Sequence, residues 1–191
     1  ALKGLRRKAG ELITNKIVTS DLLQLVDAKV ASGKGVIDEH TLRNIALAYG
    51  GDENIAGNAV LFLNKADLIA FGDVRGTSEK KAVYEITPDT TNPNTGIIQD
   101  GGLVVKYCIN SNCKALNGTA QEANSGNDIV TMFYGQPENA ELDLFGDYEV
   151  AVSEDYKFTS NMLTIKGDAD LGAGVVKKDG FVALVLRKKT A

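Results

Sequence analysis

The residues from Phe181 to Leu186 form an uninterrupted apolar run, FVALVL, directly after the turn signal Lys178-Asp179-Gly180. The run has the length of a strand, and both of its faces are apolar. A strand of this kind is stable only where other parts of the chain cover both faces. The C-terminal stretch is therefore predicted to be a central structural element and not a loose tail.

Two segments before this run also have strand character. Residues 149–152 alternate between polar and apolar positions, which is the period of a half-buried strand. Residues 162–165 are short and mostly apolar, and they include β-branched side chains that favour strands. Together with residues 181–186, these segments predict a C-terminal sheet.

The first half of the chain has helical patterns. Residues 2–18 carry Leu5, Ala9 and Leu12 at helical spacing and predict an amphipathic helix. Asp38 is placed to cap a helix over about residues 39–49. Asn64 is placed to cap a short helix in which Asp67 completes a capping box, and Leu68, Ile69 and Phe71 are predicted to pack that helix down.

Strand patterns predominate later, at residues 59–63, 82–86, 103–109 and 128–134. Residues 87–95 contain two prolines and predict a loop. Residues 110–127 are rich in Asn, Ser and Gly and predict a mobile loop. Helices first and strands later indicate an α+β fold and not a regular βαβ series.

Composition excludes several classes of protein. The chain has 191 residues, of which 43% are hydrophobic, and a net charge of −4, which gives no general basic field for binding nucleic acid. No apolar run reaches the roughly 20 residues that span a bilayer, and we expect no membrane partner. No signal peptide is evident. Cys108 and Cys113 are therefore predicted to be reduced.

The sequence contains no recognisable catalytic or metal-binding motif. His40 is the only histidine, so a histidine metal cluster or a nucleophile–histidine pair cannot form, and we expect His40 on the surface. The carboxylates at 147, 149, 154 and 155 are interpreted as a solvated strand edge. We therefore predict no enzyme, no cofactor and no metal.

Two features of the N-terminal third bear on organisation and partners. Residues 32–35, Ser-Gly-Lys-Gly, lack the spacing of a phosphate-binding loop and are interpreted as a flexible connector at a domain boundary. Lys3, Arg6, Arg7 and Lys8 crowd the first half of the first helix. They form either a solvated face or a surface for an acidic partner, which is a neighbouring subunit or nucleic acid.

Several stretches, in order, resemble the major capsid protein of tailed bacteriophages, the Hong Kong ninety-seven phage fold. They are Thr41–Tyr49, Ala59–Leu68 (AVLFLNKADL), Met132–Gly135 with Asp147–Val150, and Val152–Ile165 followed by Phe181–Leu186. The resemblance covers roughly residues 36–189. It implies a peripheral domain, residues 1–35 and 147–191, and an inserted axial domain, residues 36–146.

The resemblance also implies a function. The chain is expected to be a structural subunit of an icosahedral shell around double-stranded DNA, to assemble into pentamers and hexamers in the bacterial host cytoplasm, and to reside in the virion capsid. Scaffolding, portal or decoration proteins are further expected partners. Arg6, Arg7, Lys188 and Lys189 are expected to face DNA or a neighbour. The family's N-terminal arm and extended loop are expected to be missing from this chain.

Some capsid proteins of this family cross-link their subunits through an isopeptide bond between a lysine and an asparagine. By resemblance, Asn161 matches the asparagine and Asp168 matches the acid that accepts the proton, which is Glu in the cross-linking relative. The alternative is that both are ordinary strand and turn residues. The lysine would lie in the missing loop.

Two other functions stay open at this point. An encapsulin-type nanocompartment shell shares the fold but encloses an enzyme cargo. A small-molecule-binding or enzymatic α+β domain would instead show a deep apolar pocket with convergent polar groups. The structural prediction that tests the capsid interpretation is a contact between residues 2–18 and residues 162–186.

Overall fold

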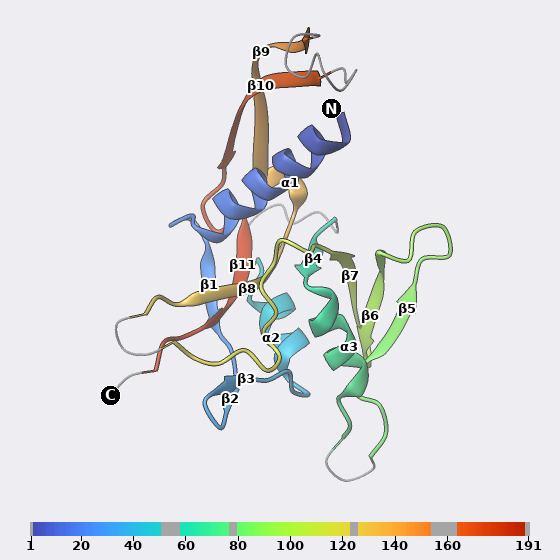
Figure 1. The fold of residues 1–191 in the computed structure, drawn as a ribbon. Coiled ribbons are helices and arrows are strands. Elements are labelled where there is room, and N and C mark those ends of the chain that lie inside the picture. Colours follow the sequence, from blue (N-terminus) through green and yellow to red (C-terminus); the bar gives the residue numbers. More distant parts are fainter. Residues whose placement is uncertain (1, 51–57, 77–79, 123–125, 154–163, 190–191) are drawn as a thin grey trace.

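The computed structural model describes residues 2–50, 58–76, 80–122, 126–153 and 164–189, with side chains for all of these ranges except near Leu2 and over residues 147–169. These parts of the chain form a seven-stranded mixed sheet, a long two-stranded hairpin and the helices that cover them (Figure 1). The helices are α1 (Leu2–Val18), α2 (Thr41–Ala48), α3 (Lys65–Asp73) and the short 3-10 helix η1 (Pro137–Asn139). The strands are β1 (Gln24–Asp27), β2 (Val30–Ala31), β3 (Lys34–Gly35), β4 (Val60–Leu63), β5 (Glu85–Pro88), β6 (Thr95–Asp100), β7 (Leu103–Ile109), β8 (Ile129–Gly135), β9 (Ala140–Ser153), β10 (Thr164–Val175) and β11 (Phe181–Leu186).

The large sheet has the strand order β1-β11-β8-β4-β7-β6-β5. Strand β11 lies between β1, with which it is parallel, and β8, with which it is antiparallel. All six residues of β11 are buried. The prediction that the C-terminal apolar run is a strand covered on both faces is therefore confirmed.

Different helices cover the two faces of this sheet. On one face, Leu42 and Ile45 of α2 and Phe71 of α3 pack with core residues that include Val182 and Leu184 of β11. On the other face, Ile17 of α1 packs with Phe133, Phe181 and Ala183. Alternating residues of β11 thus contribute to two cores on opposite faces, which accounts for an apolar run without polar positions.

The predicted α+β fold class is confirmed, while the extent of several elements differs from the prediction. Strands β9 and β10 are long and continuous, whereas the sequence indicated only short segments at 149–152 and 162–165. Strand β6 was not predicted. The strand expected at 82–86 lies at Glu85–Pro88, and Ile69, expected to pack α3 down, is 59% exposed.

Strand pairing does not follow the predicted division of the chain at residues 35 and 147. Strands β1 and β11 come from the segments assigned to the peripheral domain, yet they pair within one sheet with β8 and β4. Residues 140–146, assigned to the axial domain, belong to the long hairpin with β10. The division into two domains stays a prediction.

Residues 110–127 were predicted to be a mobile loop, but the structure shows that residues 110–122 of this segment are docked on α3. Leu116 is fully buried, and its backbone N–H donates to the Asp67 carboxylate at 2.9 Å. The Asn117 N–H donates to the same carboxylate at 2.9 Å. The Asn64 side chain caps α3 through Ala66 N–H, as predicted, and also donates to the Cys113 carbonyl.

Asp67 therefore has a different role from the predicted capping box. It lies in the first turn of α3 and is fully buried, and it holds the segment 49 and 50 residues downstream. Burial raises the pKa of this carboxyl, although the N–H donors of Asn117 and Leu116 oppose that shift.

Candidate assembly surfaces

Helix α1 packs against the β9–β10 hairpin and against β11 (Figure 1). Ile17 is 5% exposed and lies in one cluster with Phe181 and Ala183, and Val175 at the end of β10 packs on the same cluster. The predicted contact between residues 2–18 and 162–186 is confirmed. The first helix and the C-terminal strands thus form one packed unit, although most of the chain separates them in sequence.

A polar contact reinforces this packing. The side-chain amide of Asn110, just after β7, donates to the hydroxyl of Thr14 at 2.9 Å. Thr14 is 2% exposed, and its hydroxyl donates in turn to the Gly10 carbonyl at 2.8 Å. Because Thr14 is buried and Asn110 is half-buried, this pair helps to fix the position of α1 along its axis as well as its distance from the sheet.

The face of the hairpin that is turned toward α1 is apolar. Residues alternate between the faces of a strand, and residues paired across the ladder share a face. Ala140 pairs with Val175, and both pack on the cluster that contains Ile17. The same face continues with Leu142 and Leu144 of β9 and with Ala173 and Leu171 of β10.

The opposite face of the hairpin is acidic and points away from α1. It carries Glu141 and Asp143 of β9 and Asp170 of β10, all exposed, and these three residues are called here the acidic hairpin face. Phe145 lies among them, opposite Asp170, and is 62% exposed. Its ring lies over Gly172, where a Cβ would approach the ring to 2.5 Å.

The N-terminal half of α1 carries a second charged surface. Lys3, Arg6 and Arg7 are exposed and lie on one side of the helix, and they are called here the basic row. By helical spacing this side continues into Gly10, Thr14 and Ile17, of which Ile17 packs on the sheet and Thr14 accepts a hydrogen bond from the Asn110 amide. The basic row thus extends the packed side of α1 beyond the body that the helix covers.

The residues predicted for covalent cross-linking are only partly placed. Asn161 lies outside the described residues. Asp168 lies in β10, where it pairs with Glu149 of β9 next to a register shift. The cross-link stays a prediction.

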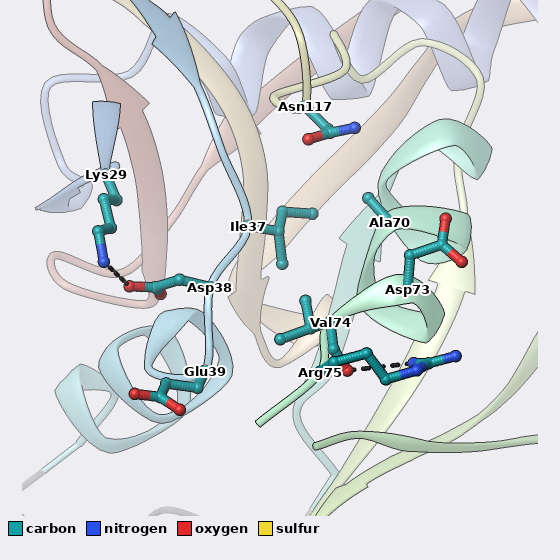
Figure 2. A pocket seen from close by; sticks show the side chains of 9 residues that line it. All are labelled: Lys29, Ile37, Asp38, Glu39, Ala70, Asp73, Val74, Arg75 and Asn117. Carbon is teal, nitrogen blue, oxygen red and sulfur yellow. Dashed lines mark hydrogen bonds and ion pairs between the residues drawn. The ribbon is translucent and has the colours of Figure 1, made fainter. Parts of the chain in front are cut away.

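A polar cleft of about 410 Å³ lies between α3 and the segment that leads into α2 (Figure 2). Lys29 and Asp38 form an ion pair of 2.8 Å at one side of it. Burial by itself would raise the pKa of Asp38, but hydrogen bonds from Lys29, Thr41 and His40 outweigh it and lower that pKa. The prediction that Asp38 caps a helix from residue 39 is wrong: α2 begins at Thr41 after the N-cap residue His40, and Asp38 instead accepts hydrogen bonds from the His40 N–H and the Thr41 hydroxyl.

The charged groups of this cleft do not converge on one point. Arg75 donates to the carbonyls of Gly72 and Val74, Asp38 is engaged by Lys29, and Glu39 points away from Asp73 (Figure 2). His40 is exposed, as predicted. In the described parts of the chain no group of three or more His, Cys, Asp or Glu side chains is placed to hold a metal ion.

A second hollow, of about 470 Å³, lies on the sheet beside the region that α1 covers. Val60, Phe62, Ile97 and Cys108 form its floor, and burial raises the pKa of the Cys108 thiol. Its charged side chains, Lys106 and Asp89, are exposed. It therefore lacks the convergent polar groups expected of a small-molecule site, although its floor is apolar.

No protein-family model matches the sequence, and no curated protein matches it. Among solved structures, the capsid of an empty GTA particle matches with a TM-score of 0.64 and 12% identity, and the capsid of a native GTA particle with 0.59 and 13%. The fold is that of a capsid protein. The matches cover 97% and 92% of this chain but only 63% and 60% of the capsid chains, so this chain spans about three fifths of their length.

The two charged surfaces are of interest because the fold is shared with capsid chains. At 12–13% identity the similarity lies in the arrangement of the elements and not in shared side chains. Within the described residues, the helices are too short or too polar to cross a membrane. The α1–hairpin unit carries one basic surface and one acidic surface.

Proposed function

We propose that this protein is a structural subunit of a bacteriophage or prophage capsid, a shell that encloses double-stranded DNA and forms by self-assembly into pentamers and hexamers. The observation that carries the proposal is the capsid fold itself, in which α1 packs on β10 and β11. The two capsids with this fold were both computed with C5 symmetry, as fits a subunit that repeats around a fivefold axis.

The surfaces of the molecule support this proposal over a catalytic one. Shell subunits work through extended interfaces that are repeated by symmetry, and these need exposed apolar and charged surfaces more than a pocket. The hairpin exposes Leu144 and Phe145 at 55% and 62%, and both belong to a strand that projects from the sheet (Figure 1). We therefore propose a non-enzymatic role, located in the virion and assembled in the host cytoplasm.

Expression in bacteria followed by gradient sedimentation tests the proposal. A shell subunit sediments as particles of hundreds of copies or as capsomers, and DNA inside particles resists nuclease. An encapsulin-type shell would give particles of similar size that contain a protein cargo and no protected DNA. A protein that stays monomeric at every concentration would contradict both shell functions and favour the small-molecule-binding alternative.

A further inference from the structure

We propose that the basic row of α1 docks on the acidic hairpin face of a second copy of this chain. The inference deepens the proposed function and rests on it, because it names the surfaces through which two copies meet. The basic row consists of Lys3, Arg6 and Arg7, and the acidic hairpin face consists of Glu141, Asp143 and Asp170.

The basic row has no partner among the residues that the structure describes. All three of its side chains are exposed, and none makes an ion pair with any residue that the structure describes. The neighbouring Lys8, by contrast, pairs with Glu11 at 3.4 Å on another side of the helix. The row also lies on the side of α1 that is otherwise packed, through Thr14 and Ile17, so a bound partner would continue an existing contact surface.

Within the described parts of the chain, the acidic hairpin face makes no ion pair either, and it is turned away from the basic row of the same molecule. The hairpin turns its apolar face to α1, because Ala140 and Val175 pack on the cluster of Ile17. Glu141 and Asp143 alternate with Ala140 and therefore point to the other side. Their opposite charges can be joined only between two copies, and such a contact is heterologous, as in a ring of subunits.

The shape of the acidic hairpin face also allows an arginine side chain to approach its carboxylates. Gly172 and Gly174 leave β10 without side chains opposite Asp143 and Glu141, so the surface is shallow there. The edge of the Phe145 ring lies against Gly172, and the side chain stays 62% exposed. A guanidinium that approaches the carboxylates can stack on this ring, which adds a cation–π contact to the charge pairing.

Duplex DNA is the competing partner for a basic surface, and the observations favour the second copy. The row has three cations on a chain of net charge −4. A DNA contact that uses three cations is weak and strongly salt-dependent. The chain itself supplies a matching set of three carboxylates on a surface that its own helix cannot reach.

Charge reversal tests the inference with four variants of the full chain. The first is Lys3→Glu/Arg6→Glu/Arg7→Glu, and the second is Glu141→Lys/Asp143→Lys/Asp170→Lys. The third combines both sets. The fourth, Lys16→Glu/Lys65→Glu/Lys114→Glu, reverses three exposed lysines elsewhere and matches the charge change of the first. Acidic residues early in α1 favour the helix, so the first variant is expected to fold, and circular dichroism checks this for all four.

Sedimentation velocity over a range of protein concentrations measures self-association. We expect each of the first two variants to weaken self-association at least about tenfold in low salt. The combined variant should restore it, because the charges are again complementary. The fourth variant should associate like the wild type, and salt should weaken the wild-type association as screening increases.

The outcomes separate the inference from the proposed function. A wild type that never associates overturns the proposed function and this inference with it. A wild type that associates, together with a first variant that associates equally well, overturns the inference alone. The inference is also overturned if the first variant binds less duplex DNA than the wild type while the second variant self-associates like the wild type. This result would assign the basic row to nucleic acid.

Discussion

The Asn110 amide donates a hydrogen bond to the Thr14 hydroxyl at 2.9 Å and joins two residues that are 96 positions apart. Thr14 lies on α1 and Asn110 follows β7, so this bond ties the first helix to the face of the sheet that it covers. Around it, Ile17 and Phe133 supply the apolar part of the contact. The α1–sheet junction is therefore specified by a polar pair as well as by buried area.

Replacing Thr14 by valine keeps the shape of the side chain and removes the acceptor. The half-buried Asn110 amide then loses its partner, and we expect the free energy of unfolding to fall by about 1 kcal/mol. Urea denaturation measures the change. Thr19→Val is the matched control, since the Thr19 hydroxyl also bonds a carbonyl four residues back but is exposed. Equal losses in the two variants would contradict the role of the Thr14–Asn110 pair.

The buried Asp67 makes stability depend on pH in a defined direction. Burial raises its pKa above the ordinary value of 3.8, so between 3.8 and the raised value the folded state binds more protons than the unfolded state. Stability from this group is therefore present below pH 3.8 and is lost as pH rises through the folded pKa. The wild type should lose stability relative to Asp67→Asn as pH rises from about 4 to 7, as measured by urea unfolding at each pH.

An unchanged difference between wild type and Asp67→Asn over this range would contradict the raised pKa. Asp128 provides an internal comparison of the opposite sign. The Lys188 N–H and the Arg187 guanidinium lower the pKa of Asp128, so its contribution is present above its ordinary pKa and is lost as pH falls below that value. The difference between wild type and Asp128→Asn should therefore shrink toward acid.

The docked segment 110–122 should protect one cysteine from alkylation. Both cysteines are free thiols, but Cys113 is 3% exposed, and burial together with the nearby Asp67 raises its pKa to about 12. Relative to an ordinary value of 9.0, this lowers the thiolate fraction about a thousandfold. We expect iodoacetamide to label the half-buried Cys108 first, as read by mass spectrometry of the peptides. Equal labelling rates in the folded protein would show that the segment is not docked.

Close packing at the β8–β11 junction predicts a second stability effect. A Cβ at Gly135 would lie 2.5 Å from both the Gly180 carbonyl and the Phe181 ring. Gly135→Ala should therefore lower the free energy of unfolding by about 1–3 kcal/mol. Gly174→Ala is the matched control in β10, where a Cβ meets nothing within 4 Å. A melting temperature of Gly135→Ala equal to that of the control would contradict this packing.

The sequence predicted those parts of the fold whose signal is local. The burial of β11 follows from its uninterrupted apolar residues, and the Asn64 cap follows from its place before α3. Strand β6 was missed because it follows a proline-containing loop and contains Gly96, which has low strand propensity. The Tyr107 ring from the adjacent strand, 2.8 Å from where a Gly96 Cβ would lie, fills that space, and this contact is invisible in a local window.

Long-range pairing explains what could not be predicted. Strand β1 pairs with β11, and Gln24 lies opposite Val182, which is far away in the sequence. A local sequence pattern does not show such a long-range pairing, and therefore it does not indicate that residues near 25 belong to the large sheet. The position of Asp67 was predicted, but its hydrogen-bond partners 49 and 50 residues downstream were not. The basic row was recognised in sequence. Its relation to the acidic hairpin face required the register of β9 and β10.

Electron microscopy of the particles that this chain forms tests the central claim most directly. We predict closed shells or capsomer rings, and a reconstruction in which α1 of one copy lies beside the β9–β10 hairpin of the next. A protein that stays monomeric at every concentration in the micrographs and in the ultracentrifuge would contradict the capsid function.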